Sequence, residues 1–464
     1  MKLLTRDKTF YRTLIALAIP VALQNLITFA VTFADNLMVG ALGDSAVSGV
    51  YMGSQIQTFL QMFSGGIEGA ILILAAQYWG KKDTKSIKKI IAIGLHFSVI
   101  FGLVLSAVCF IIPAQIISIF TQDAAVIADG AQYLRIVCLT YTFFCITQAL
   151  ISAMRSVEVA RIGMVVSSIS LVFNIVLNYL LIFGDAGLQR IGLPGLGVPA
   201  MGVKGAAIAT LISRIVETLV MVIYVGWVDK RLSIRLADVL QSDSVLRRDF
   251  IRYGLPIIGG QVVWSVNMMA NSAILGRFGQ SVIAAASVAN TMNSLAYVTM
   301  NGMSSAVGVI TGKTVGAGKT ELVKEYARTV QILFLCLGLI TGGAIALLKT
   351  PFIGLYSGIT AEAARYSWQF ITVLSVTMIG TCYQAACLFG LVKSGGDIGF
   401  VFKNDTIFVF LVVLPSAIIA AWLGAPAWVV YACLKCDQIL KCIVAFFKIN
   451  SYNWMKNLTR DQTA

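Results

Sequence analysis

Residues 13–34, TLIALAIPVALQNLITFAVTFA, form an apolar run that contains no charged side chain. At 1.5 Å per residue, a helix of this length covers about 30 Å, which is the thickness of the hydrocarbon core of a bilayer. The basic residues before the run resemble the start of a signal peptide, but the run continues without a small-residue cleavage site. We therefore expect a first membrane-spanning helix that is retained in the protein.

Eleven further apolar segments follow along the chain. Hydrophobic residues make up 58% of the 464 residues, charged residues make up 12%, and the mean hydropathy is +0.85. Helices are expected because the segments are too long for the strands of a membrane barrel. The fold class predicted is therefore an all-α integral membrane protein with twelve transmembrane helices. The spans are expected near 13–34, 50–79, 90–112, 131–153, 162–184, 203–227, 250–275, 283–311, 328–348, 366–391, 405–423 and 427–447.

The positive charges lie in short segments between the apolar runs. Of the 35 lysines and arginines, 26 fall on the side of the membrane that carries both termini, six fall on the other side, and three lie inside spans. This asymmetry predicts that both termini face the cytoplasm. The net charge of +14 thus reflects orientation in a lipid bilayer, and no nucleic-acid partner is expected.

The sequence contains an internal repeat. A shift of 236 positions places 17–83 on 253–319 without a gap, so that Pro20 meets Pro256 and Gly80 meets Gly316. Because six spans separate the copies, both have the same orientation, and two parallel six-helix lobes should be related by a pseudo-two-fold axis along the membrane normal. The expected division is an N-terminal lobe at 1–228, a cytoplasmic linker at 229–249, and a C-terminal lobe with a cytoplasmic tail at 250–464. Such a repeat is typical of secondary transporters.

Five segments carry a resemblance to a known family. They are PVALQNLITFAVTFADNLMVG at 20–40, AAQYWGKKD at 75–83, NIVLNYLLIFG at 174–184, GAAIAT at 205–210 and SYNWMKNLT at 451–459. In their order and spacing they resemble the multidrug and toxic compound extrusion (MATE) family. The resemblance implies two six-helix lobes that form a V. It also implies a cell-membrane antiporter that exports small organic, often cationic, compounds by alternating access, driven by an inward flow of protons or sodium ions.

Asp35 is the first candidate for the coupling site, because an ionisable group within a span is costly. Helix rise places Asp35, Asn174, Asn178 and Thr210 at roughly similar depths, about 8–15 Å from the outer surface. Carboxylate, amide and hydroxyl oxygens suit Na⁺, and a carboxyl group removed from water can instead carry a proton. The resemblance implies a cation site at Asp35, Asn174 and Thr210, and Asn178 stands where many members have Asp. The alternative is that Asp35 lies at a helix end near lipid headgroups.

The repeat equivalent of Asp35 is Asn271, so the charge is present in one half only. Polar and soft side chains elsewhere are candidates for a substrate cavity, for which lipid-facing or packing roles are the alternative. They are Gln24, Glu68, Gln261, Asn267, Asn271, Tyr297 and Met300. Pro20 interrupts the first helix and is a candidate hinge, for which a static kink is the alternative.

Other sequence features argue against enzymatic and cofactor functions. The nine cysteines lie in apolar segments, and no nucleophile motif or His/Cys/Asp cluster is present, so we expect neither catalysis nor a cofactor. The segment GVITGKTVGAGKT at 308–320 departs from the spacing of a phosphate-binding loop, so no nucleotide is expected. Two intramembrane pairs, Arg214 with Glu217 and Asp437 with Lys441, have the spacing of helical ion pairs.

The leading interpretation is a monomeric cation-coupled exporter of small organic molecules. A flippase for a lipid-linked oligosaccharide or another amphiphile is the alternative, although such a protein would be expected to carry more basic residues within its helices. A channel or a membrane enzyme is a third class, for which no selectivity filter or catalytic motif is seen.

Overall fold

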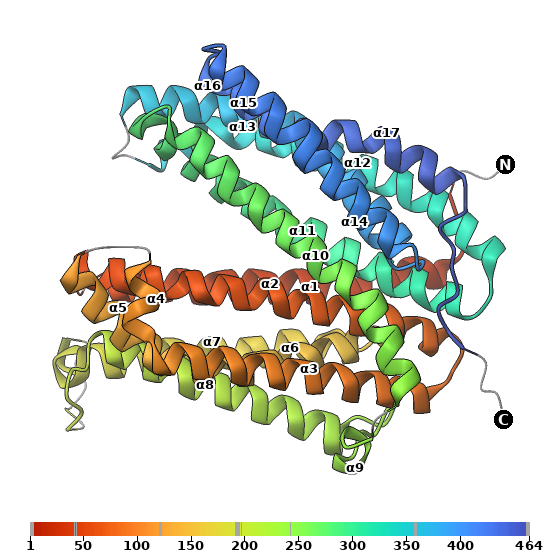
Figure 1. Cartoon of the computed structure of the whole chain (residues 1–464), viewed down its shortest axis with the longest axis horizontal. Helices are drawn as coiled ribbons and strands as arrows, with labels where there is room; N and C mark the ends of the chain where they lie inside the picture. Colours follow the sequence, from red (N-terminus) through yellow and green to blue (C-terminus); the bar gives the residue numbers. More distant parts are fainter. Residues whose placement is uncertain are drawn as a thin grey trace. The chain divides into compact units, whose positions relative to one another are not determined.

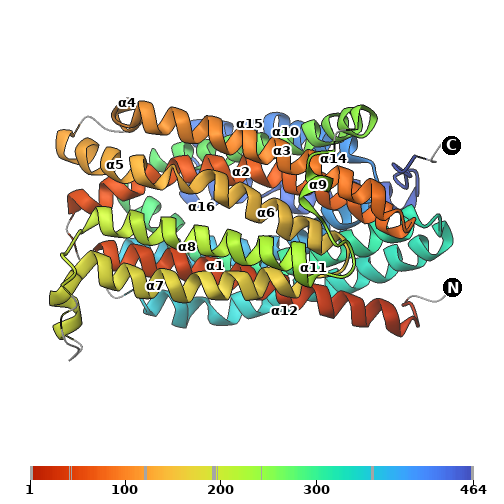
Figure 2. The same ribbon diagram turned by 90° about the horizontal axis from the view of Figure 1, so that it is seen from below.

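The computed structural model is built of helices (Figures 1 and 2). It describes residues 4–190 except 41, 43 and 120–122, together with 195 and 197–460 except 242 and 357–359. No strand occurs in the described residues, which contain one isolated β-bridge between Gly396 and Met455. The helices are α1 (Lys8–Gly40), α2 (Asp44–Gly80), α3 (Thr84–Ile111), α4 (Pro113–Ser118), α5 (Ala124–Val137), α6 (Thr140–Ser156), α7 (Arg161–Arg190), α8 (Val203–Ile223), η1 (Tyr224–Val228), α9 (Leu236–Val239), α10 (Ser244–Gly276), α11 (Gln280–Gly316), α12 (Thr320–Gly354), α13 (Ala361–Gln384), η2 (Ala385–Lys393), α14 (Ile398–Ile407), η3 (Phe408–Val413), α15 (Leu414–Trp422), α16 (Ala427–Leu434) and α17 (Asp437–Asn450).

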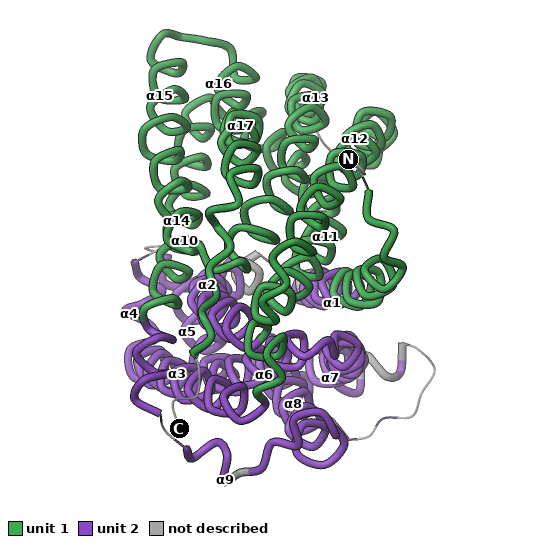
Figure 3. The backbone as a smooth tube through the Cα atoms, turned by 90° about the vertical axis from the view of Figure 1, so that its right-hand side faces the viewer, with its two compact units in different colours: residues 1–22, 76–83, 252–464 green, residues 23–75, 84–251 purple. Residues whose placement is uncertain are grey.

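The chain forms two compact units (Figure 3). Unit 1 contains residues 1–22, 76–83 and 252–464, and unit 2 contains 23–75 and 84–251. These boundaries differ from the lobes expected from the sequence, because the start of α1 and the end of α2 group with the C-terminal half. The first boundary falls within α1, two residues after Pro20. In unit 2, α6 packs against α3 and α8, and α7 packs against α8.

Eight helices in the described residues are long and apolar enough to cross a membrane, and a ninth span results if α5 and α6, bent by 49° at their junction, are taken together. The expected span at 131–153 is therefore broken near Cys138. The last expected span, 427–447, is likewise divided into α16 and α17 at Lys435 and Cys436. Helix α10 begins at Ser244 and so includes the end of the segment expected to be the linker.

The helix bounds reproduce the repeat found in the sequence. Helices α1 and α10 each have 33 residues, and α2 and α11 each have 37. The bounds of each pair differ by 236 residues at both ends, the shift that aligns the two halves of the sequence. Both copies also turn through a left-handed residue after the second helix, at Lys82 with φ 62° and at Gly318 with φ 71°.

A reciprocal glycine contact joins the ends of α2 and α11 within unit 1. A Cβ atom on Gly80 would lie 1.9 Å from the carbonyl oxygen of Lys313, and a Cβ atom on Gly316 would lie 1.8 Å from the carbonyl oxygen of Gln77. Gln77 and Lys313 are themselves 236 residues apart, so the two contacts are equivalent in the repeat. Glycine is needed at both positions because the backbones approach too closely for any side chain.

We predict that Gly80→Ala and Gly316→Ala each lower the stability of the protein by about 1–3 kcal/mol, because the added methyl group must push two backbones apart. The measurement is the thermal unfolding midpoint in detergent. Gly343→Ala is the matched control, because nothing lies within 4 Å of a Cβ atom at that helical position. Equal midpoints for all three variants would contradict the close contact.

The C-terminal segment after α17 is docked on unit 1. Lys448 Nζ and Lys456 Nζ each lie 2.7 Å from the carboxylate of Asp397, and the backbone N–H of Lys456 donates to Gly395 O at 2.7 Å. The side chain of Gln77 accepts from the N–H of Leu458 at 2.7 Å. Burial alone would raise the pKa of Asp397, but the hydrogen bonds from Lys448 and Lys456 hold this pKa below its ordinary value.

A lowered folded-state pKa means that the ionised Asp397 stabilises this docking at neutral pH, and that the contribution is lost as the pH falls below about 4. Asp397→Asn should therefore accelerate amide hydrogen exchange in 451–460 at pH 7. The wild-type segment should show the same acceleration in acid, after correction for intrinsic rates. Asp243→Asn, in unit 2, is the control. Unchanged exchange in the Asp397 variant would disprove the role of the ion pairs.

Candidate functional site

The carboxylate of Asp35 lies in unit 2 among polar groups from α7 and α8. The side-chain amide of Asn178 donates one hydrogen bond to Asp35 Oδ1 and another to Asn174 Oδ1, the latter at 3.1 Å. Asn174 and Asn178 are one turn apart on α7, so both face α1, and both are at most 2% exposed. The structure thus brings together three of the four residues that the sequence suggested for the cation site.

One oxygen atom of this cluster has no hydrogen-bond partner in the described protein. It is Asn178 Oδ1, which is buried beside the carboxylate of Asp35. Buried polar atoms are nearly always paired, so an unpaired acceptor next to a carboxylate calls for a donor or a cation. Carboxylate and amide oxygens are ligands that a hard cation such as Na⁺ accepts.

Helix α8 adds an ion pair to the cluster. Arg214 Nη1 lies 2.6 Å from Glu217 Oε2, and the hydroxyl of Ser170 on α7 donates to the same oxygen at 3.4 Å. The charge of Arg214 also acts on Asp35. The predicted i,i+3 pair is therefore formed, and it belongs to the same cluster as Asp35, which the sequence did not indicate. Two carboxyl groups thus share one guanidinium in this cluster.

Thr210 is the fourth predicted member, and it is placed differently. Its hydroxyl donates to the carbonyl oxygen of Ala206 at 2.9 Å, one turn earlier in α8. Among the described residues, no hydrogen bond joins Thr210 to Asp35, Asn174 or Asn178. It lies one turn before Arg214 on α8.

Comparison with known proteins gives the family. The model of the family described as MatE matches residues 20–180 and 256–419, which is more than half of the chain. The chain belongs to the MATE family. The two matched segments begin 236 residues apart, at the equivalent positions Pro20 and Pro256 of the repeat. The family consists of transporters, and this protein is accordingly a multi-pass membrane transporter.

Curated relatives of this MATE transporter carry names that refer to drug resistance. A probable multidrug resistance protein NorM from Listeria monocytogenes is 25% identical over 343 residues, covering 73% of this chain and 72% of the relative. A probable multidrug resistance protein YoeA from Bacillus subtilis is 25% identical over 353 residues, covering 74% and 72%.

Solved structures share the fold. A transporter of the MOP superfamily from Pyrococcus furiosus superposes with a TM-score of 0.83 at 18% identity, covering 97% of this chain and 99% of that chain. An outward-facing multidrug resistance MATE family transporter superposes with a TM-score of 0.82 at 18% identity, over the same shares of the two chains. At these identities the likeness shows the fold alone.

A second polar cluster in unit 2 contains two of the tentative cavity residues of this MATE transporter. Arg155 Nη2 donates to Gln24 Oε1 at 2.6 Å, and the charge of Arg155 also acts on Glu68. Gln24 is 4% exposed, and its packing requires Gly163, where a Cβ atom would come within 2.7 Å of Gln24 Oε1. Both candidates therefore have partners inside the unit. From the sequence, Arg155 is counted among the 26 positive charges outside the spans on the terminus side, whereas the structure places it in the last turn of α6.

The remaining cavity candidates lie on α10 and α11 of unit 1. Asn267 and Asn271 are one turn apart, and the Oδ1 atom of each is buried without a hydrogen-bond partner in the described residues. Gln261 and Tyr297 are half-buried. Met300 is 4% exposed and belongs to the hydrophobic core of the unit, so it is placed as a core residue and not as a cavity wall.

Unit 1 also contains a buried charge cluster. Lys441 Nζ lies 3.1 Å from Asp437 Oδ2, as the i,i+4 spacing predicted, and 2.9 Å from Asp405 Oδ1 on α14. Asp405 was not singled out from the sequence. It could have been found in the sequence, because it is an aspartate inside the apolar stretch from Ile398 to Trp422, and a charge within a membrane span requires a partner.

We predict that Arg214→Leu destabilises the protein by about 3–5 kcal/mol, because it leaves the carboxylates of Glu217 and Asp35 without their buried counter-charge. The double variant Arg214→Leu/Glu217→Leu should recover part of this loss, since both members of the pair are then replaced by apolar groups. Thermal unfolding in detergent measures both effects. A double variant no more stable than the single one would show that Glu217 does not depend on Arg214.

Proposed function

We propose that this MATE transporter is a cation-coupled antiporter that exports small organic, mostly cationic, compounds from the cytoplasm. The observation that carries the proposal is the Asp35 cluster, in which a carboxylate within a membrane span is held by Asn178 beside an unpartnered amide oxygen. The names of the relatives, which refer to multidrug resistance, support the export of organic compounds.

The charge of the cluster explains how an ion can drive a change of state. With Asp35 and Glu217 ionised and Arg214 protonated, unit 2 holds one uncompensated negative charge in an apolar region. An unpaired charge there is costly, and a proton or a sodium ion at Asp35 removes the imbalance. Occupancy by the coupling ion therefore changes the energy of any conformation in which this cluster is shielded from water. The ion would be held by Asp35, Asn174 and Asn178, with Thr210 as a neighbour on α8.

The repeat supports alternating access between two related halves. We propose twelve spans, with α10, α11 and the broken pair α16–α17 added to the α5–α6 pair and the eight apolar helices. The reciprocal contacts of Gly80 and Gly316 support the pseudo-two-fold relation, because each residue of one copy meets the equivalent partner of the other. Pro20, which lacks a backbone N–H and precedes the unit boundary in α1, is the proposed hinge.

We further propose that the protein is a monomer of the plasma membrane with both termini in the cytoplasm. The excess of lysine and arginine on the terminus side supports this orientation. Organic cations are the substrate class that a net negative intramembrane cluster attracts. A flippase for a large amphiphile remains an outcome that the transport experiment distinguishes.

The proposal predicts that Asp35→Asn abolishes gradient-driven transport while the protein still folds. Purified protein is reconstituted into liposomes, and the movement of ethidium is followed by fluorescence under a pH gradient or a sodium gradient imposed separately. Wild-type protein should respond to at least one gradient, and Asp35→Asn should fall to the rate of protein-free liposomes, since it cannot change charge. Glu321→Gln, which neutralises an exposed carboxylate, should keep the wild-type rate.

Two results would contradict the proposal. One is a wild-type rate in the Asp35 variant under the effective gradient. The other is movement of ethidium by the wild-type protein that depends on neither gradient. A protein that moves a labelled lipid-linked oligosaccharide but not ethidium would instead be a flippase.

A further inference from the structure

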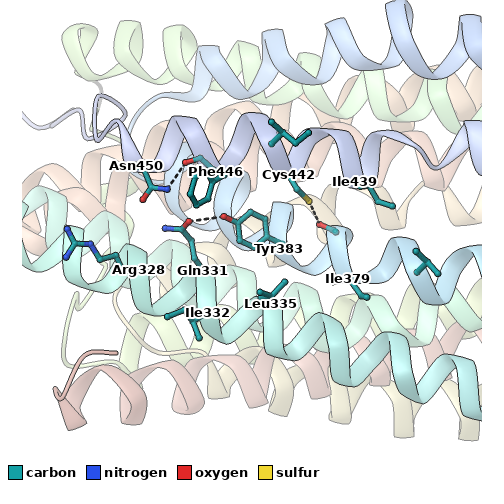
Figure 4. Close-up of a pocket in the computed structure, with 13 residues that line it drawn as sticks. Arg328, Gln331, Ile332, Leu335, Ile379, Tyr383, Ile439, Cys442, Phe446 and Asn450 are labelled. Atoms are coloured by element: carbon teal, nitrogen blue, oxygen red, sulfur yellow. Dashed lines mark hydrogen bonds between the residues drawn. The ribbon is translucent and has the colours of Figure 1, made fainter. Parts of the chain in front are cut away.

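Three helices of unit 1 enclose an apolar groove that the transport site does not use (Figure 4). Helix α13 forms its floor and packs against both α12 and α17, which flank it. The groove has a volume of about 870 Å³. Its walls include Leu335, Val376 and Ile443, which are 45%, 55% and 57% exposed. In a membrane protein, exposed apolar side chains of this kind face hydrocarbon and not water.

The polar groups at the floor of the groove form hydrogen bonds with one another, so they offer no polar site to a ligand. Tyr383 donates to Gln331 Oε1 at 2.8 Å, and Cys442 Sγ donates to Gly380 O at 3.4 Å. Figure 4 shows both bonds between residues that line the groove. Because these polar groups are already paired, an occupant of the middle of the groove must be apolar.

One end of the groove is positively charged. Arg328, in the third turn of α12, lines that end together with Asn450 at the end of α17. Arg328 Nε donates to the hydroxyl of Tyr452 at 3.2 Å, and among the described residues the guanidinium forms no ion pair with a carboxylate. Lys324, one turn earlier, is paired with Glu321 at 2.6 Å. The terminal nitrogens of Arg328 are therefore available to an anion.

The charged end lies at the level of the chain's N-terminal segment. The backbone N–H of Thr5 donates to Thr329 Oγ1 at 2.8 Å, directly beside Arg328. If the termini are cytoplasmic, as proposed above, this end opens at the inner leaflet, where anionic lipids are concentrated. An apolar slot with one unpaired arginine at the headgroup level matches a molecule that has a hydrocarbon tail and an anionic head.

We propose that this groove binds a single anionic phospholipid. One acyl chain lies along the exposed side chains of α12 and α17, and its phosphate accepts hydrogen bonds from the guanidinium of Arg328. A guanidinium binds a phosphate through two parallel hydrogen bonds, which a neutral amide cannot reproduce. The site selects for net headgroup charge, because in zwitterionic phosphatidylcholine the repulsion between Arg328 and the quaternary ammonium offsets the attraction between Arg328 and the phosphate.

The experiment measures lipid binding at equilibrium, so its result does not depend on whether the protein transports anything. Delipidated full-length protein in detergent is titrated with phosphatidylglycerol or with phosphatidylcholine of the same acyl chains, and bound lipids are counted by native mass spectrometry. Wild-type protein should bind phosphatidylglycerol more tightly. Arg328→Gln should weaken that binding on the order of tenfold and leave phosphatidylcholine binding unchanged.

Two further variants separate the groove from the rest of the surface. Ile443→Trp places a larger side chain in the groove and should weaken the binding of both lipids, without unfolding a protein in which Ile443 is 57% exposed. Arg247→Gln removes an exposed arginine of unit 2 that does not line the groove, and it should leave both affinities unchanged.

Four results would overturn the proposal. They are equal binding of the two lipids by the wild-type protein, a loss in Arg328→Gln no greater than in Arg247→Gln, and unchanged lipid binding in Ile443→Trp. The fourth is a wild-type dimer, seen by light scattering, that Ile443→Trp dissociates, because this face would then be an interface between two copies of the chain.

Discussion

The hydrogen bond between Asn178 and Asp35 is the contact on which the proposed function depends. A carboxylate within an apolar span is tolerated only where polar partners meet it, and here they come from α7, with α8 adding Arg214. The hydrogen bonds of Asn178 are not all formed. Its amide nitrogen donates to both Asp35 and Asn174, whereas its own oxygen has no partner in the described residues. The proposed uptake of a cation rests on these two features, the excess of carboxyl groups over guanidinium groups and the unfilled acceptor.

The two copies of the repeat share a scaffold and differ in chemistry. Equal helix lengths and the paired contacts of Gly80 and Gly316 are properties of the backbone, and they are kept in both halves. Asp35 and its equivalent Asn271 are not alike, so a charge is present at this level in one copy only. In unit 1, the charge cluster of Asp405, Asp437 and Lys441 lies instead near the junction of α16 and α17. The repeat therefore specifies how the helices pack, and single substitutions on it specify where charged side chains lie.

Irregular helix segments accompany the charged clusters of unit 1. A π-helical segment follows α13 directly, another follows α14, and α16 and α17 are separated by a break. Such irregularities free backbone groups, which must be paired within the protein because the bilayer offers no water.

The apolar groove between α12, α13 and α17 belongs to the same unit but is lined mainly by apolar side chains instead of charged ones. Its middle is lined by apolar side chains, and Arg328 at one end, which forms no ion pair with a carboxylate among the described residues, is the group proposed to meet an anionic headgroup.

Composition, hydropathy and the 236-residue shift were enough to predict a helical membrane protein with a repeat, and the resemblance of five short segments, in their order and spacing, indicated its family. They were enough because spans and repeats are linear patterns, read along the chain one segment at a time. Asp35 could also be identified from the sequence alone, because it is an ionisable residue within a predicted span. The pairs within one helix, Arg214 with Glu217 and Asp437 with Lys441, also followed from their spacing. Partners on other helices cannot be read in this way, because Arg155 meets Gln24, and Lys441 meets Asp405, across 131 and 36 residues of sequence. Only the packing of the helices decides which polar side chains meet, because in the membrane interior each one must find its partner within the protein.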